Sequence, residues 1–267
     1  MSHYKIEAAT GQHLGSRDLQ QDRTALMVAP KSPGYMLAIL ADGLGGKAGG
    51  TLAAEQVIYT AKQLFANFEA TRHDPETLLR TLVHDAHLVI KINGFSSQTE
   101  PHSTLVALIL SPEGDAIWAH VGDSRLYRFD KDQCIDHTTD EGYIEKLVSG
   151  GKLTREAAKN HRHSHLLMNA LGHSINEPFV TMGRQSGLKV GDAFLLCSDG
   201  LWHYFNDSEL ARAVHLKAPR QASEMLIEKA QERAQGKGDN CTMAIVKLVK
   251  PPPEVKGYTV EKLRRAV

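Results

Sequence analysis

Several short apolar runs in this chain stop at, or start just after, an aspartate that stands beside a glycine. The pairs are Asp42-Gly43, Gly122-Asp123, Asp199-Gly200 and Gly238-Asp239, and the adjoining runs cover residues 35–41, 116–121, 193–198 and 241–246. Such runs are typical of buried strands. Because strands of one sheet bring distant residues together, these carboxylates would repel one another unless a cation lay between them. Hard divalent cations with oxygen ligands are the natural candidates.

Length, charge and cysteine content exclude several classes of protein. A chain of 267 residues is long enough for one large domain or two small ones. It carries 31 Lys and Arg against 31 Asp and Glu, so it lacks the basic excess that binds nucleic acid or a membrane surface. The 3 cysteines form no Cys-x-x-Cys pair, and no window of about 18 residues is apolar enough to span a bilayer. We therefore expect a soluble, cytoplasmic protein.

The order of the expected elements favours an α+β fold. Strands are expected at residues 5–9, 24–29, 35–41, 104–110, 116–121, 126–129, 179–183, 193–198 and 241–249. Apolar residues spaced three and four apart predict helices near 53–68, 75–92, 208–215 and 220–234. Helices thus come in pairs between groups of hairpin-linked strands, unlike the alternation of a parallel sheet. This order suits antiparallel sheets packed together with helix pairs outside.

Five short motifs occur in order along the chain. They are Arg17-Asp18-Leu19-Gln20-Gln21-Asp22, Asp42-Gly43-Leu44-Gly45-Gly46, Gly122-Asp123-Ser124-Arg125, Ser198-Asp199-Gly200-Leu201-Trp202 and Gly238-Asp239-Asn240-Cys241-Thr242. A single Asp-Gly pair is explained as well by a tight turn. Together, however, the motifs resemble the metal-dependent protein phosphatases (the PPM family, or type 2C serine/threonine phosphatases) in their bacterial single-domain form. The resemblance extends over about residues 8–249.

The resemblance implies a fold and a domain plan. The expected fold is a four-layer α-β-β-α sandwich, in which two central antiparallel sheets are flanked by helix pairs. Residues 1–249 would form the catalytic domain, and residues 140–178 would be a flap that borders the active site. Residues 250–267 would be a proline-rich link and a tail.

The resemblance also implies a set of metal ligands. Asp42 would bridge two core metal ions, and the backbone carbonyl of Gly43 would bind the first of them. Asp199 and Asp239 would bind the second ion, and Asp123 would bind a third, weaker one. Ligands that offer only oxygen fit Mg²⁺ or Mn²⁺ better than Zn²⁺, which prefers histidine and cysteine.

The implied reaction is hydrolysis of phosphoserine and phosphothreonine in proteins by single-step attack of a metal-bridging hydroxide. Asp22 would hold metal-bound waters, and the Arg17 guanidinium would grip the substrate phosphate. The expected partners are phosphorylated proteins and a serine/threonine protein kinase whose action the enzyme reverses. We expect a monomer that binds neither nucleic acid nor membrane.

The match departs from the family pattern at a few positions. Some relatives carry a histidine where this chain has Leu44 or Lys47, so the proton donor to the leaving oxygen is not identified. Glutamine stands at positions 20 and 21, but the acid Asp22 is present. Two alternatives stay open, namely a non-catalytic pseudophosphatase that binds phosphoproteins and a phosphohydrolase for small molecules. Walker, Gly-x-Ser-x-Gly and His-Glu-x-x-His motifs are absent from the sequence.

Overall fold

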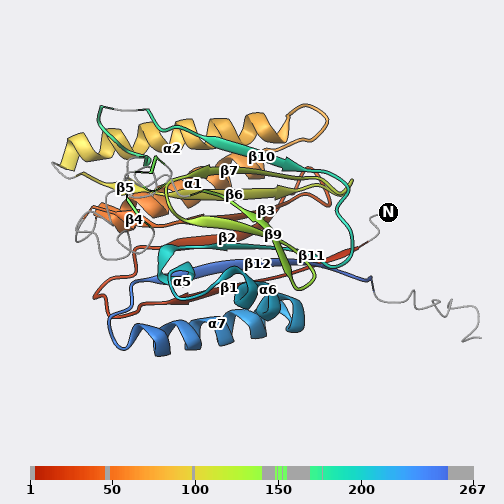
Figure 1. Cartoon of the computed structure of the whole chain (residues 1–267). Helices are drawn as coiled ribbons and strands as arrows, with labels where there is room; N and C mark the ends of the chain where they lie inside the picture. The colour runs from red at the N-terminus through yellow and green to blue at the C-terminus, as the bar shows by residue number, and fades with distance from the viewer. Residues whose placement is uncertain are drawn as a thin grey trace, which may run out of the picture.

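Two antiparallel sheets of five strands each form the centre of the protein (Figure 1). The computed structural model describes residues 4–45, 49–97, 100–139, 148, 150–151, 153–154, 169–175 and 177–251. The strand order in sheet I is β10 (Thr181–Gln185), β7 (Ala116–Val121), β6 (Leu105–Leu110), β3 (Met36–Ala41) and β2 (Arg23–Val28). The order in sheet II is β1 (Lys5–His13), β12 (Cys241–Val249), β11 (Asp192–Cys197), β8 (Arg125–Asp130) and β9 (Gln133–His137).

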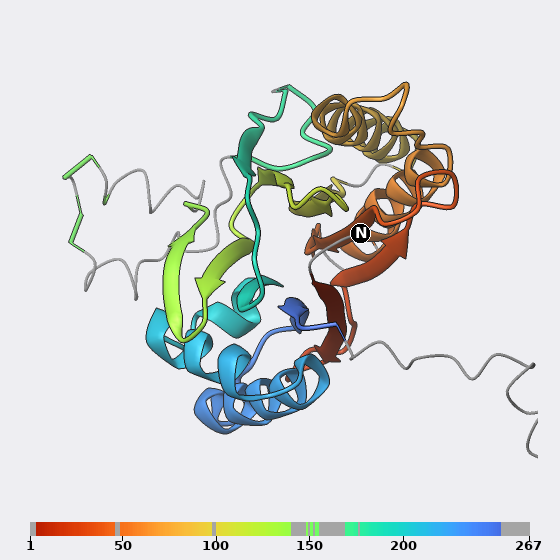
Figure 2. The same ribbon diagram turned by 90° about the vertical axis from the view of Figure 1, so that its right-hand side faces the viewer.

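Helices cover the outer face of each sheet (Figures 1 and 2). The long helices α1 (Gly49–Ala66) and α2 (Pro75–Ser97) pack on sheet I, and α6 (Asp207–Leu216) and α7 (Pro219–Ala234) pack on sheet II. The short helix α5 (Asp199–Trp202) and the ribbon of β4 (Gly43–Leu44) and β5 (His102–Ser103) lie toward the left-hand side of Figure 1. This layer order confirms the predicted four-layer sandwich.

The core consists of three apolar layers, one between each pair of neighbouring structural layers. On strand β3, Leu37 and Ile39 pack under α1 and α2, whereas Ala38 and Leu40 pack between the two sheets. Successive side chains of a strand point to opposite faces, so a strand that is covered on both sides must be apolar at every position. This explains why the runs that end in aspartate show no alternation with polar residues.

The predicted elements agree with the structure except where the chain is exposed or an element is short. The predicted strands at 116–121 and 241–249 coincide with β7 and β12, and the predicted hairpin is β6–β7. Strand β9 is not predicted because it is a largely polar edge strand, and α5 is only four residues long. Helix α1 ends at Ala66, so Phe68, used to predict it, lies beyond the helix but is still buried.

Two segments named in the sequence analysis lie largely outside the residues that the structure describes. Most of the polar segment 140–178, and nearly all of 250–267, fall outside the described residues. Among the helices that the structure describes, none has the length and the apolar character that a bilayer crossing requires.

Candidate active site

The predicted acidic residues gather at one end of the sandwich because the strands next to them end there. In sheet I, Asp42 follows β3 and Asp22 precedes β2, and the residues between them pair as Arg23 with Ala41. The strand pairing in sheet II brings two further aspartates to this end of the sandwich. Asp199 follows β11 and Asp123 lies just before β8, where Cys197 pairs with Arg125.

The fifth aspartate reaches the same end from the start of β12. Cys241 pairs with His13 at the end of β1, so Asp239 and the loop that carries Arg17 leave the sheet side by side. Ser16 reinforces this contact, since both its backbone N–H and its hydroxyl donate to the carbonyl of Gly238 at 2.8 Å. Both sheets therefore supply carboxylates to one site.

Asp22 is the most deeply buried of these carboxylates, with no exposed surface. Its Oδ2 accepts a hydrogen bond of 2.7 Å from the Ser198 hydroxyl at the end of β11, and that hydroxyl in turn accepts from the Thr242 N–H at 3.0 Å. The buried Oδ1 of Asp22 has no hydrogen-bond partner among the described residues. The hydrogen bond between Ser198 and Asp22 therefore links the two sheets at the acidic site.

The carboxylates raise one another's affinity for protons. Burial is the largest cause of the raised pKa of Asp42, and the charges of Asp22, Asp199 and Asp123 raise it further. Burial also raises the pKa of Asp22, although its bond to Ser198 opposes the rise. The site thus concentrates negative charge around one fully buried and several half-buried carboxylates.

Arg17 places a positive charge on this cluster. Its guanidinium pairs with Oδ2 of Asp239, and its charge also acts on Asp199 and Asp42. The Arg17 side chain is 58% exposed, so it lies at the solvent-facing rim of the cluster. Asp239 is further held by its own loop, because its Oδ1 accepts from the Asn240 N–H at 2.7 Å.

The loop of Asp42 and Gly43 is held by direct backbone contacts. The Asp42 N–H donates to the Thr104 hydroxyl at 2.9 Å, and the Thr104 N–H donates to the Asp42 carbonyl at 2.9 Å. Gly43 lies against Gly50 in the first turn of α1, where a Cβ added to Gly43 would come within 2.0 Å of the Gly50 carbonyl oxygen. Only glycine fits there, so the backbone of Gly43 is fixed beside Asp42.

Trp202 connects the segments that carry Asp123 and Asp199. Its indole N–H donates to the backbone carbonyl of Asp123 at 3.0 Å, and it lies in α5, which begins at Asp199. The Arg125 guanidinium stacks over the Trp202 ring at 3.6 Å from its centre. The roles of Trp202 and Ser198 are not predicted from the sequence, although both residues stand in the motif that carries Asp199.

The donor set fits hard divalent cations. Burial and the charges of Asp22, Asp199 and Asp123 raise the pKa of Asp42, and a buried carboxylate oxygen of Asp22 lacks a hydrogen-bond partner among the described residues. A cation would stabilise such an environment. No group of three or more His, Cys, Asp or Glu side chains in the described residues is close enough together to hold one ion by itself. Carboxylate oxygens are nevertheless the ligands that Mg²⁺ and Mn²⁺ prefer.

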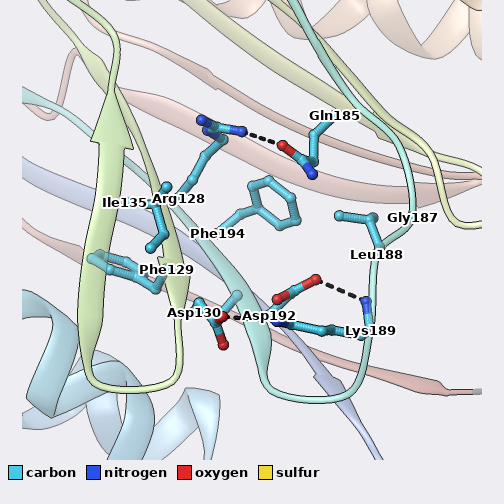
Figure 3. A pocket seen from close by; sticks show the side chains of 11 residues that line it. Arg128, Phe129, Asp130, Ile135, Gln185, Gly187, Leu188, Lys189, Asp192 and Phe194 are labelled. Carbon is cyan, nitrogen blue, oxygen red and sulfur yellow. Dashed lines mark hydrogen bonds and ion pairs between the residues drawn. The ribbon is translucent and has the colours of Figure 1, made fainter.

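A separate pocket of about 240 Å³ lies at the opposite ends of β8 and β11 (Figure 3). Its charged groups are paired with near neighbours, since Lys189 contacts Asp130 at 2.8 Å and Arg128 donates to Gln185 at 2.7 Å. Because Asp192 and Asp130 pair at the far end of the strands from Cys197 and Arg125, this pocket is not part of the acidic site.

The sequence matches known proteins over most of its length. A sequence model of the family described as protein phosphatase 2C matches residues 11–230. The chain is 30% identical over 224 residues to the serine/threonine protein phosphatase PstP of Mycobacterium tuberculosis, which covers 81% of this chain and 41% of that protein. It is also 30% identical over 220 residues to the serine/threonine phosphatase stp of Listeria innocua, which covers 79% of this chain and 83% of that protein.

The fold also matches those of solved phosphatase structures. The catalytic domain of the serine/threonine protein phosphatase PstP, in complex with 2 manganese ions, superposes with a TM-score of 0.75 and 27% identity. The superposition covers 92% of this chain and 99% of that domain. The chain spans only 41% of the length of the mycobacterial relatives that it matches in sequence.

Proposed function

Because the chain belongs to the protein phosphatase 2C family, we propose that it is a metal-dependent phosphatase that hydrolyses phosphoserine and phosphothreonine in proteins. The observation that carries the proposal is the cluster of strand-end aspartates from both sheets, with Arg17 at its exposed rim. Residues 1–249 would constitute the catalytic domain.

Mg²⁺ or Mn²⁺ is the proposed cofactor, with two core ions and a third, weaker one. Asp42 would bridge the core ions and the Gly43 carbonyl would bind the first, while Asp199 and Asp239 would bind the second. Asp123 would hold the third ion. When bound, the ions would supply a hydroxide nucleophile at neutral pH and neutralise charge on the phosphate.

The chain's own residues would orient the substrate and its water. Arg17 offers a planar set of N–H donors that matches two phosphate oxygens. Its salt bridge with Asp239 keeps the guanidinium at the site before a substrate binds. Asp22 would hold water through the Oδ1 that has no partner in the described residues, while Ser198 fixes its other oxygen.

The proposed substrates are phosphorylated proteins, including those of a serine/threonine protein kinase. The carboxylate cluster supports catalysis rather than simple binding, because a module that only binds phosphate would gain nothing from buried negative charge. We further propose that the protein acts in the cytoplasm as a monomer. Comparison of a phosphothreonine peptide with small phosphate esters and nucleotides as substrates separates the protein phosphatase from a small-molecule phosphohydrolase.

The central test is metal-dependent turnover by the purified protein. We expect hydrolysis of a phosphothreonine peptide that requires Mn²⁺ or Mg²⁺ and stops with EDTA. Asp42→Ala and Asp199→Ala should each lower kcat/KM by at least about a hundredfold, because they remove charge that holds the ions. Asp136→Ala is the matched control, since this exposed aspartate lies on edge strand β9. Full activity without a divalent ion, or in Asp42→Ala, would refute the proposal.

A further inference from the structure

One buried polar side chain has no part in the site described above. His87 lies in the middle of α2 and has no exposed surface. Its neighbours on the helix, Val83, Ala86 and Ile90, belong to the apolar core under sheet I. A polar group in such a place destabilises the fold unless it is hydrogen-bonded, so the partners of His87 indicate why the residue is there.

The imidazole binds the backbone of residues 169–175, which we call the return segment. The Gly172 N–H donates to Nδ1 of His87 at 3.1 Å. A backbone N–H can donate only to an unprotonated ring nitrogen, so the proton of the neutral ring is on Nε2. Nε2 lies 3.5 Å from a carboxylate oxygen of Glu177 but forms no hydrogen bond with a described residue. Burial lowers the pKa of His87, which favours this neutral form.

The return segment fits tightly where His87 holds it. Gly172 has a φ of +87°, and a Cβ on it would come within 2.4 Å of both Ile90 Cγ2 and the Pro101 carbonyl oxygen. The adjacent Leu171 is fully buried and exchanges two backbone hydrogen bonds with Ser103, at 2.9 and 3.3 Å. The segment is therefore fixed between α2 and strand β5.

Strand β5 in turn pairs with the strand that carries a proposed metal ligand. Ser103 pairs with Gly43, and His102 pairs with Leu44. Next to this pair, Thr104 and Asp42 exchange the two hydrogen bonds described above. An unbroken series of hydrogen-bonded neighbours thus runs from His87 through the return segment and β5 to the Asp42-Gly43 loop.

We propose that His87 is a positioning residue, which holds the return segment against β5 and thereby fixes the Asp42-Gly43 loop for metal binding. The inference rests on the proposed function only in the assumption that this loop binds a metal ion. His87 touches neither metal nor substrate and acts through the backbone of Gly172 and Ser103. Groups that hydrogen-bond metal ligands tune metal affinity from outside the ligand set, and His87 would extend such support further along the backbone.

The test compares His87→Leu with His87→Asn. Leucine fills the space but accepts no hydrogen bond, whereas the Oδ1 of asparagine lies near the position of Nδ1 and can accept from Gly172. His84→Leu is the control, because His84 is exposed one turn earlier on the same helix. Binding of Mn²⁺ alone is measured by the electron paramagnetic resonance signal of the free ion, and kcat and KM are measured with a phosphothreonine peptide.

We expect His87→Leu to weaken Mn²⁺ binding by about tenfold or more, to lower kcat and to leave KM at saturating Mn²⁺ nearly unchanged. His87→Asn should recover most of the Mn²⁺ affinity, and His84→Leu should bind Mn²⁺ as the wild type does. A folded His87→Leu that binds Mn²⁺ normally, or a folded His87→Asn no better than His87→Leu, would overturn the proposal.

A measurement on the unmodified protein covers the case in which the variants do not fold. Nitrogen-15 spectra of the histidine rings at neutral pH should show His87 as the tautomer with its proton on Nε2. Finding the proton on Nδ1 would also overturn the proposal. If the wild type binds Mn²⁺ but hydrolyses no phosphopeptide, the proposed function fails while the Mn²⁺ and tautomer measurements still decide the role of His87.

Discussion

At the scale of single residues, Arg17 acts on both the substrate and the metal-binding carboxylates. Its guanidinium pairs with Asp239 and lowers the local negative charge, which stabilises the cluster in the absence of a cation. The same guanidinium faces solvent and has the geometry to bind phosphate. These two roles predict opposite effects on phosphate binding and on metal binding when the side chain is removed.

We therefore expect Arg17→Ala to lower kcat/KM for a phosphothreonine peptide by about a hundredfold, mainly through KM. Its affinity for Mn²⁺ should be equal to or higher than that of the wild type, because a competing positive charge is gone. Steady-state kinetics and Mn²⁺ titration measure the two effects. Arg220→Ala is the control, since Arg220 is 85% exposed on α7. Weaker Mn²⁺ binding by Arg17→Ala would contradict the electrostatic argument.

At the scale of elements, the start of α1 is placed by contact between two glycines. A Cβ on Gly50 would come within 2.5 Å of the Gly43 carbonyl oxygen and 2.6 Å of the Gln21 side-chain nitrogen. The neighbouring Gly49 has space, since a Cβ there would be 3.8 Å from Pro101. The two adjacent glycines in the first turn of α1 therefore differ in whether a side chain can replace their hydrogen: a Cβ fits at Gly49 but not at Gly50.

This difference predicts the effect of two alanine substitutions. Gly50→Ala should destabilise the protein by about 1–3 kcal/mol, because backbone must move to admit the methyl group, and it should weaken Mn²⁺ binding by displacing Gly43. Gly49→Ala should leave stability unchanged or raise it by up to about 1 kcal/mol, because alanine favours a helix. Urea unfolding measures both free energies. Equal effects of the two substitutions would show that the contact is unimportant.

At the scale of the whole molecule, the site exists only where the two sheets meet. Sheet I supplies Asp22 and Asp42, and sheet II supplies Asp199 and Asp239. A cation that binds these groups together binds the folded state and not the unfolded chain. By mass action it must then stabilise the fold as a whole.

We expect Mn²⁺ at about a hundred times its dissociation constant to raise the free energy of unfolding by about 2.7 kcal/mol. The melting temperature should rise accordingly, and EDTA should reverse the increase. Asp42→Ala should abolish most of the shift while Asp136→Ala retains it. A melting temperature that does not respond to Mn²⁺ in the wild type would contradict a metal site shared between the sheets.

The sequence predicts the strands and the layers of this fold better than it predicts individual hydrogen bonds between side chains and backbone. Continuous apolar runs mark strands covered on both faces, and two of these runs end at Asp42 and Asp199. The place of Asp22 in the site is implied only by the family resemblance. The edge strand β9 is not predicted because it is largely exposed and its sequence has no apolar pattern. The roles of Trp202 and His87 are not predicted either, because each depends on one hydrogen bond to the backbone of a distant segment. Trp202 donates to the Asp123 carbonyl, and His87 accepts from the Gly172 N–H.

The pairing of β1 with β12 affects when the protein can become active as it is synthesised. These strands pair along all nine residues of each, and Arg17 meets Asp239 across 222 positions of sequence. A growing chain on the ribosome therefore carries an unpaired β1 until the codons for β12 have been translated. Contacts of such long sequence separation form slowly, so we expect a nascent chain to be inactive until β12 has left the ribosome.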